Sequence, residues 1–181
     1  QVLDLSEAYR ERIVDYMFSE YADGRTPNPD ILCNREIKFD LFLKSAIELG
    51  AEAVATGHYC QKEEVQTANG SIYRLLTGRD TNKDQSYFLY DLPQEVLARV
   101  VFPLGELTKA DTRLEAGRHG LRTADKPESQ DLCLADHHGS MRAFLDAYLP
   151  PRDGEIVLQD GTVVGQHDGI EHFTIGQRKG L

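Results

Sequence analysis

The sequence predicts an α/β fold with a partial parallel sheet, followed by the start of a small β-containing domain. A helical pattern of apolar residues ends at Gly50 and leads into the short apolar run from Ala53 to Thr56. This order of helix, glycine and buried strand is typical of parallel sheets. After Pro150 glycine and aspartate recur at predicted turn positions, between stretches of alternating apolar and polar residues. This pattern is typical of antiparallel hairpins. With 40% apolar residues in a chain of 181, a packed core is expected.

The first half of the chain contains two predicted helices and a predicted hairpin. Apolar residues recur at helical spacing through residues 2–20, with Ser6 as the expected N-cap. A second helix is expected over residues 37–49, before Gly50. The stretch "EVQTANGSIYRLL" predicts a β-hairpin with a type I′ turn at Asn69 and Gly70.

The second half contains shorter elements and a predicted domain boundary. The stretches "QSYFLYDL" and "PQEVLARV" predict short helical pieces, and "VVFPLGEL" predicts a short strand and a turn. A helix capped by Thr108 is expected to run to about His119, with Gly120 at its C′ position. Another helix is expected over residues 139–149, and a turn at Asp160–Gly161. We place the boundary near residue 150, which divides a catalytic domain (1–150) from the start of a central domain (151–181).

Charge and cysteine content restrict the possible functions. The net charge of −10 disfavours nucleic-acid binding on charge alone, because such binders usually neutralise phosphates with basic residues. Three cysteines without a Cys-x-x-Cys pair argue against a disulfide scaffold and a structural zinc site, and favour a reducing cytoplasm. Cys60 lacks a partner motif and is interpreted as structural. The sequence contains no apolar run of membrane-spanning length and opens in mid-pattern without Met, so we expect a fragment of a longer protein that is not membrane-bound.

The stretch "TPNPDILCN" presents polar side chains and a thiol on a stiff loop. Pro27 and Pro29 restrict the backbone and expose Asn28 and Asp30. Asp30 is expected to cap the following helix, which places Cys33 near its first turn, where the helix dipole favours a thiolate. The alternative is that Asp30 only caps the helix and that Cys33 is a small buried residue; this stretch alone slightly favours the alternative.

A second cysteine motif, "SQDLCLADHH", contains Cys133. It is either a second reactive thiol, part of a metal site, or a buried loop cysteine beside solvated histidines. Adjacent histidines do not face the same side of a regular element, so a metal site is disfavoured and none is expected. Asp131 and Asp136 would oppose a thiolate at Cys133.

Two further stretches are candidate ligand contacts. In "ATGHY", Gly57 ends the predicted parallel strand, where open α/β sheets bind ligands; a tight turn with a structural His58 explains the pattern equally well. In "DTNKDQSYFL", Lys83, Asp84 and Gln85 suit phosphate and base contacts, although a solvated loop is the simpler interpretation of this stretch alone.

Taken together, six stretches resemble one family, the bacterial tRNA-specific 2-thiouridylases. They are "GRTPNPDILCNREIKF", "ATGHY", "KDQSYFL", "PLGELTKADTR", "KPESQDLC" and "HFTIGQRKGL", in the order of that family. The resemblance implies an ATP-pyrophosphatase domain of the adenine-nucleotide α-hydrolase-like fold, a small central domain and a C-terminal β-barrel. It implies an enzyme that replaces the C2 oxygen of the wobble uridine in tRNA by sulfur, after ATP-dependent adenylation of that oxygen.

The resemblance also implies roles for matching residues. Cys133 would carry the persulfide. Cys33 would be the second catalytic cysteine, which attacks the persulfide to release sulfide or closes a disulfide with Cys133 after transfer. The implied binding residues are Asn28, Pro29 and Asp30 for the target base, with Asp30 as candidate general base, Gly57 for ATP, and Lys83, Asp84 and Gln85 for tRNA.

The implied cofactor is ATP with Mg²⁺. The implied partners are tRNA and a sulfur-relay donor protein, and the enzyme itself would be a monomer in the cytoplasm. The Ser-Gly-Gly-x-Asp-Ser loop on which the ATP site of the family depends does not occur in this sequence, so we expect this chain alone to be inactive. Two rival interpretations remain open: another enzyme of the ATP-pyrophosphatase fold, and a non-enzymatic module that binds RNA or metal through residues 133–138.

Overall fold

The computed structural model describes residues 2–126, 139–150 and 152–179. The chain divides into two compact units, one formed by residues 1–9 with 30–127 and the other by residues 10–29 with 128–181. The predictions for Cys133, and for the aspartates and histidines around it, lie outside the described residues.

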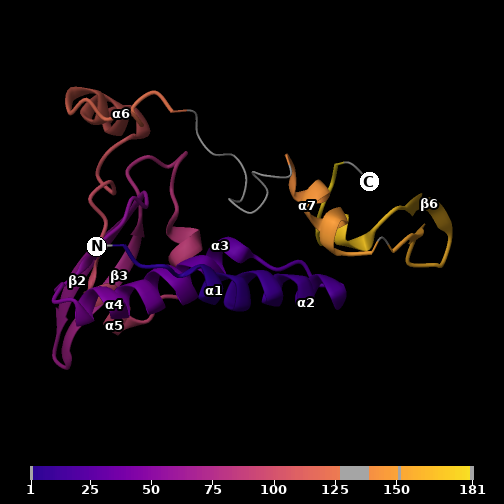
Figure 1. The fold of residues 1–181 in the computed structure, drawn as a ribbon, viewed down its shortest axis with the longest axis horizontal. Coiled ribbons are helices and arrows are strands. Elements are labelled where there is room, and N and C mark those ends of the chain that lie inside the picture. Colours follow the sequence, from indigo (N-terminus) through magenta and orange to yellow (C-terminus); the bar gives the residue numbers. More distant parts are fainter. Residues whose placement is uncertain (1, 127–138, 151, 180–181) are drawn as a thin grey trace. The chain divides into compact units, whose positions relative to one another are not determined.

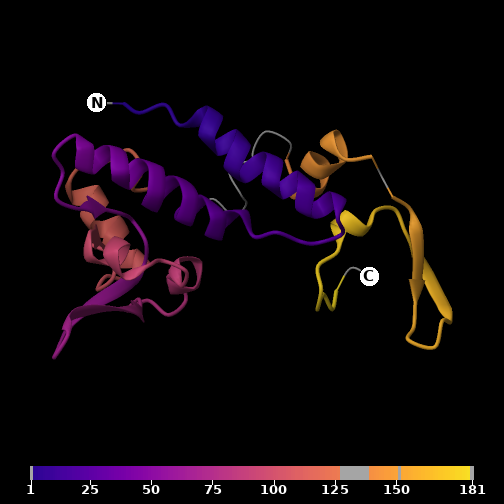
Figure 2. The ribbon, with the colours of Figure 1, turned by 90° about the horizontal axis from the view of Figure 1, so that it is seen from below.

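The first unit is built on a long helix that carries the first cysteine motif. Three consecutive segments, α3 (Pro29–Leu32), the π-helical η2 (Cys33–Phe42) and α4 (Leu43–Glu48), form one continuous ribbon in Figure 2. The helix ends before Gly50, whose φ of 92° is the left-handed conformation that favours glycine after a helix. The predicted second helix is therefore confirmed, with a start eight residues earlier than the apolar pattern indicated.

The short helix α1 (Ser6–Tyr9) corrects one capping prediction. Ser6 is the first helical residue, and the Asp4 carboxylate accepts a hydrogen bond from its backbone N–H at 3.0 Å. The prediction of Ser6 as N-cap was wrong because an acidic side chain two residues earlier reaches the same backbone donor.

A small parallel sheet confirms the predicted fold class. Strand β1 (Val54–Ala55) pairs in parallel with β4 (Val100–Val101), so two segments about 45 residues apart along the chain lie side by side. Val100 of β4 belongs to a core cluster with five other buried residues. These are Phe39, Cys60, Leu89, Leu92 and Leu97. The core contact of Cys60, which is 0% exposed, supports its structural interpretation.

The predicted hairpin is confirmed, but its turn differs from the prediction. Strands β2 (Cys60–Thr67) and β3 (Gly70–Thr77) lie side by side (Figure 1). Thr67 pairs opposite Gly70, so Ala68 and Asn69 form the turn. A type I′ turn requires positive φ at both central residues. No described residue other than glycine has positive φ, and Gly70, at 109°, lies one position after the turn. The type I′ assignment was therefore wrong.

The elements after the hairpin agree with the sequence. They are η3 (Ser86–Leu89), α5 (Gln94–Ala98), β4, and α6 (Lys109–Arg118). Thr108 and Asp111 form a reciprocal capping box at the start of α6, and Gly120 follows its end with φ of 63°. The helix prediction from Thr108 to about His119 is confirmed.

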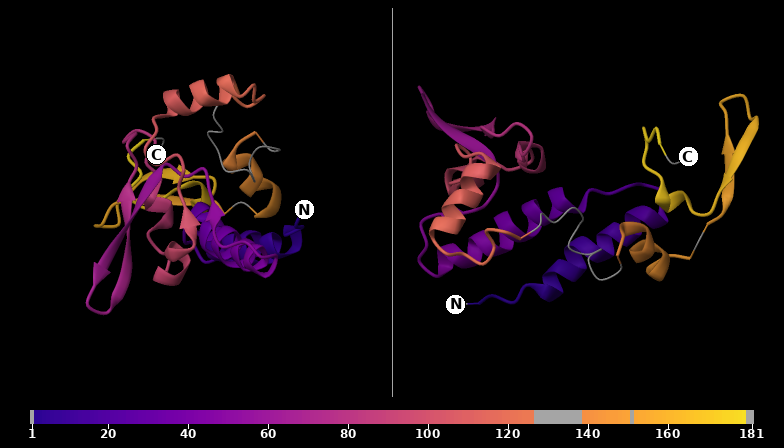
Figure 3. Two further views of the ribbon diagram at one scale, coloured as in Figure 1. Left: turned by 90° about the vertical axis from the view of Figure 1, so that its left-hand side faces the viewer. Right: turned by 90° about the horizontal axis from the view of Figure 1, so that it is seen from above.

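The second unit contains η1 (Arg10–Asp15), α2 (Tyr16–Ala22), α7 (Met141–Tyr148), β5 (Gly154–Val157), β6 (Val163–His167) and η4 (Ile170–His172). Figure 3 shows β5 and β6 as an antiparallel hairpin. The Leu158 carbonyl accepts the N–H of Gly161, so the predicted turn is centred on Gln159 and Asp160, one residue before its expected position.

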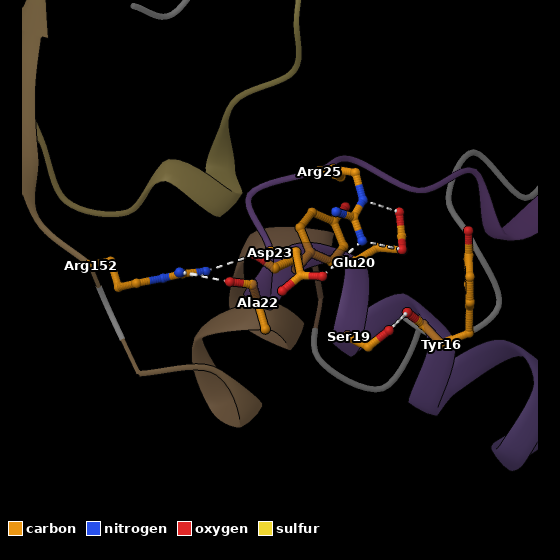
Figure 4. A network of polar contacts seen from close by, with 8 residues as sticks. Tyr16, Ser19, Glu20, Ala22, Asp23, Arg25 and Arg152 are labelled. Atoms are coloured by element: carbon orange, nitrogen blue, oxygen red, sulfur yellow. Dashed lines mark hydrogen bonds and ion pairs between the residues drawn. The ribbon is translucent and has the colours of Figure 1, made fainter.

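The core of the second unit lies between α2 and α7. Met17 and Tyr21 of α2 pack with Phe144 and Leu145 of α7. Arg152 adds a polar contact, since its guanidinium donates to the carbonyls of Tyr21 at 2.7 Å and Ala22 at 2.9 Å (Figure 4). A cation at the C-terminal end of α2 satisfies carbonyls that have no partner within the helix. No helix among the described residues has the length and apolar character needed to cross a membrane.

Candidate functional site

The first cysteine motif forms a helix start. Pro29 is buried and is the first residue of α3, a position that suits proline because its missing N–H would have no helical partner. Asp30 lies inside the first turn, so the prediction that it caps the helix was wrong: the helix begins one residue earlier. Asn28 is exposed directly before α3, and the half-buried Cys33 directly follows its first turn, as predicted.

One face of this helix carries three polar residues that sequence analysis did not connect. Asp30, Asn34 and Lys38 recur every four residues, which places them on successive turns of the same face. Asn34 is only 3% exposed, and its Oδ1 accepts a hydrogen bond from Lys38 Nζ at 3.0 Å. A buried amide therefore holds the ammonium of an otherwise exposed lysine in place. The spacing of four was visible in the sequence, but the burial of Asn34 was not.

This face determines the charge environment of Asp30. Although Asp30 is exposed overall, protein atoms around its carboxyl partly replace water and raise its pKa above the ordinary value. The positive charge of Lys38 opposes that rise. A carboxylate with a raised pKa is a better proton acceptor than an ordinary surface aspartate.

Replacement of Lys38 tests this arrangement. We expect Lys38→Met to raise the pKa of Asp30 further, because the charge that holds it down is lost, and to raise the pKa of His58, which Lys38 also lowers. Carboxyl and imidazole NMR titrations of the chain measure both midpoints. Lys44→Met is the matched control, since Lys44 lies on the same helix, is 69% exposed and pairs with Asp40. Unchanged midpoints in Lys38→Met, or equal shifts in Lys44→Met, would contradict the assignment.

Asn34 also connects the helix to the predicted tRNA-contact segment. Its Nδ2 donates to the carbonyl of Phe88 at 3.4 Å, and Phe88 lies on η3, which directly follows Lys83, Asp84 and Gln85. Within the first unit, this hydrogen bond joins the helix that carries Asp30 to the segment that follows the Lys-Asp-Gln tripeptide. The two motifs are 49 residues apart in sequence, so folding alone makes them neighbours.

The Lys-Asp-Gln tripeptide is held by hydrogen bonds to its surroundings. The Asp84 carboxylate accepts from the N–H of Gly78 at 2.8 Å and from the hydroxyl of Ser86 at 2.7 Å. Gln85 pairs twice with Tyr59, through its Oε1 at 3.1 Å and its backbone N–H at 3.0 Å. The loop is therefore preorganised and is not simply a solvated chain. Lys83, the first residue of the tripeptide, is half-buried.

The hydrogen bonds of Asp84 allow a stability prediction. Burial disfavours its charge, but the hydrogen bonds together leave the pKa of Asp84 below the ordinary value. Asp84→Asn keeps the shape but loses an acceptor, so we expect the free energy of unfolding to fall by about 1–2 kcal/mol at neutral pH.

The pH dependence gives the sign of this effect. A lowered folded-state pKa contributes stability above the ordinary aspartate pKa and loses it as pH falls through the folded value. Urea unfolding of wild type and Asp84→Asn should therefore differ at neutral pH and converge in acid. Glu48→Gln, an exposed carboxylate on α4, should show neither effect. A difference that persists in acid would refute the charge-based explanation.

The segment after β1 contains the predicted nucleotide contact. Gly57 is exposed, and a Cβ added to it would meet Leu104 Cδ1 at an ordinary 3.8 Å, so its backbone is accessible from outside the chain. His58 is buried against Phe39, and its Nδ1 lies 2.9 Å from the Thr56 hydroxyl. Burial lowers the pKa of His58 to about 4, so the ring is neutral at physiological pH, as the structural interpretation of this histidine requires.

The residues around Gly57 fit part of the site that the implied ATP would need. An open backbone at the carboxyl end of a parallel strand fits contact with an adenine nucleotide. The described residues contain no group of three acidic, cysteine or histidine side chains arranged to hold a metal ion. The residues of this chain therefore fit part of a nucleotide site and provide no described cage for Mg²⁺.

The two described cysteines differ in solvent exposure. Cys60 is fully buried in the core, and burial raises the pKa of its thiol to about 12, so it stays protonated and unreactive. Cys33 is half-buried at the start of the site helix. This contrast agrees with the structural role predicted for Cys60; the catalytic role of Cys33 stays a prediction.

Comparison with known proteins identifies the family. Residues 1–137 match the family model described as tRNA methyl transferase HUP domain, and residues 142–181 match the one described as tRNA methyl transferase PRC-barrel domain. The chain belongs to the tRNA methyl transferase HUP domain family. The HUP domain is of the adenine-nucleotide α-hydrolase-like type, so the predicted fold class is confirmed.

Curated relatives of this HUP-domain chain carry a more specific name. Proteins named tRNA-specific 2-thiouridylase MnmA are similar to it in Synechococcus sp. strain CC9311 (69% identity), Synechococcus sp. strain CC9605 (66%) and Prochlorococcus marinus strain MIT 9313 (60%). Each similarity covers 99% of this chain and 46–47% of the relative. The chain thus spans about half the length of the curated relatives it matches.

Proposed function

We propose that this chain is part of a tRNA-uridine 2-sulfurtransferase, which replaces the C2 oxygen of the wobble uridine by sulfur. The observation that carries the proposal is the identity of 60–69% along the whole chain to proteins named tRNA-specific 2-thiouridylase. The hydrogen bond between Asn34 and Phe88 supports it, because it joins the helix that carries Asp30 to the segment that follows Lys83, Asp84 and Gln85.

Asp30 is the proton acceptor in this proposal. The target uracil must lose its N3 proton as the C2 oxygen becomes a nucleophile, and the Asp30 carboxylate takes that proton while Asn28 and Pro29 contact the base. Adenylation of the C2 oxygen, the chemistry that bound ATP supplies, converts this oxygen into a leaving group. The target base must leave its stack to reach such a site.

The two catalytic cysteines complete the reaction. The terminal sulfur of a persulfide on Cys133 attacks C2 of the base, a C–S bond forms, and the adenylated oxygen leaves as AMP. The Cys33 thiolate then attacks the Cys133 sulfur, a Cys33–Cys133 disulfide forms, and the thiouridine is released. Alternatively, Cys33 attacks the persulfide first and liberates sulfide, which attacks C2. Either route leaves a disulfide that a cellular reductant must reopen.

The same proposal includes the ligand contacts, the partners and the cellular location of the enzyme. Gly57 contacts ATP, and Lys83, Asp84 and Gln85 contact tRNA. Mg²⁺, a sulfur-relay donor protein, a monomeric state and a cytoplasmic location belong to the proposal, as does a domain boundary near residue 150. The chain carries a net charge of −10, whereas tRNA is itself negatively charged. In this proposal tRNA therefore binds to a local basic surface formed by a small part of the residues.

Methyl transfer to tRNA is the second candidate, because the family description names it. The test uses a polypeptide of the relatives' full length that carries this chain, incubated with unmodified tRNA, ATP, a persulfide donor and a methyl donor of the S-adenosylmethionine class. Nucleoside mass spectrometry should find sulfur in place of oxygen in uridine, and peptide mass spectrometry should find the added sulfur on Cys133. A methylated nucleoside would favour the second candidate, and a persulfide on Cys60 alone would refute the cysteine assignment.

The two other rivals make different predictions for the same preparation. Another enzyme of the ATP-pyrophosphatase fold would consume ATP without needing Cys33 and Cys133. A non-enzymatic module would contain stoichiometric zinc that is lost in His137→Ala. Retained 2-thiouridine formation in Cys133→Ser would favour the first rival, and bound zinc without ATP consumption would favour the second.

A further inference from the structure

Two tyrosines next to the Lys-Asp-Gln loop are unusually exposed. Tyr87 is 63% exposed and Tyr90 is 68% exposed, the highest values among the tyrosines and phenylalanines of the described residues. Their rings lie 6.1 Å apart between centroids with an interplanar angle of 34°, and the Tyr87 ring also contacts Phe88 at 5.6 Å. They form a continuous aromatic surface, which we call the tyrosine pair.

The backbone beneath the tyrosine pair is rigidly held. Leu89, between the two tyrosines, is 1% exposed and anchors η3 in the core of the first unit. Phe88 accepts the hydrogen bond from the buried Asn34, and Gln85 pairs with Tyr59. The rings are therefore presented outward from a fixed backbone, so little entropy would be lost when a ligand binds to them.

The acidic residues of the neighbouring loop are turned toward the protein. Asp80 accepts hydrogen bonds from the backbone N–H groups of Asn82 at 3.2 Å and Lys109 at 3.0 Å. Asp84 accepts from Gly78 and Ser86, and Asp91, next to Tyr90, pairs with Arg35 at 2.7 Å. These carboxylates have partners within the chain, which reduces their repulsion of a phosphate backbone beside the tyrosine pair.

We infer that the tyrosine pair is a stacking platform for an unpaired base of the RNA substrate. The inference rests on the proposed function. Single-stranded loops are recognised largely by stacking of their splayed bases on tyrosine and other aromatic rings, whichever base is present. The tyrosine pair continues the segment proposed to contact tRNA, and Asn34 ties it to the helix that carries Asp30. A base held here would lie on the segment that Asn34 joins to the helix of Asp30.

The test measures RNA affinity in a polypeptide of the relatives' full length that carries this chain. The probes are an anticodon stem-loop and a fully paired RNA of equal length. Fluorescence anisotropy measures the binding of each probe at one fixed salt concentration. We expect Tyr87→Ala and Tyr90→Ala each to weaken stem-loop binding by about 5- to 150-fold, the usual range for one lost stacking contact. Tyr87→Phe and Tyr90→Phe keep the rings and should bind nearly as wild type.

Controls separate this inference from its alternatives. Tyr16→Ala removes a 42% exposed tyrosine of the second unit and should not change the affinity. Unchanged stem-loop binding in both alanine variants, or equal loss for paired RNA, would overturn the platform while leaving the proposed function intact. Rings shielded from chemical nitration in the RNA-free protein would overturn it too, since another segment would then cover them. Failure of the wild-type protein to bind tRNA at all would instead refute the proposed function.

Discussion

Cys33→Ser should abolish multiple-turnover thiolation of tRNA. Serine keeps the size of the side chain but is a far weaker nucleophile than a thiolate, so the step that resolves the persulfide is lost. We expect a fall in rate on the order of 10³-fold or more, as for removal of other catalytic nucleophiles. The measurement is 2-thiouridine formation in a polypeptide of the relatives' full length, together with the melting temperature, which should stay close to wild type because Cys33 is only half-buried.

Cys60→Ala is the matched control for this result. Cys60 is fully buried with a raised pKa, so its loss should cost about 1 kcal/mol of stability and leave the activity per folded molecule unchanged. The chain itself allows a simpler check: iodoacetamide should label Cys33 in the native state and Cys60 only after denaturation. Full thiolation by Cys33→Ser would refute the two-cysteine mechanism without affecting the fold.

Gly105→Ala should destabilise the first unit strongly. A Cβ at Gly105 would lie 2.1 Å from the carbonyl oxygen and 2.9 Å from the carbonyl carbon of Cys60, and neither atom can move without shifting the start of β2. Overpacking against side chains typically costs about 1–3 kcal/mol of stability. Because the added Cβ would meet main-chain atoms, we expect Gly105→Ala to lower the free energy of unfolding by about 3 kcal/mol or more. Because the same backbone runs beside Tyr59, which holds Gln85, the tripeptide loop should loosen as well.

Gly117→Ala provides a control of opposite sign. Gly117 lies inside α6, where an added Cβ meets nothing within 4 Å, so alanine should stabilise the helix by about 0.5–1 kcal/mol. Denaturant unfolding of both variants measures the difference. Equal effects of the two substitutions would mean that the close approach of Gly105 to Cys60 does not limit stability.

Local chemistry explains which elements were predictable. Thr108 and Gly120 mark the ends of α6 because capping uses side chains within three residues of the helix end. Both hairpins were found from their turn residues, but both turns lie one residue earlier than predicted. Glycine follows each turn in a left-handed conformation instead of occupying its centre, and sequence alone does not distinguish these registers.

By itself, the sequence determined the fold class, the family and the residues proposed for catalysis, because capping, turn residues and ordered motifs depend only on the identity and spacing of residues along the chain. The tertiary structure decided which of those residues are neighbours and which charges they meet. Asn34 looked like an ordinary polar helix residue, yet burial makes it the link between Lys38 and Phe88. Lys38 likewise became significant only when folding placed its charge near Asp30 and His58. Burial and electrostatic environment arise from contacts between segments far apart in the chain, which only the folded structure specifies.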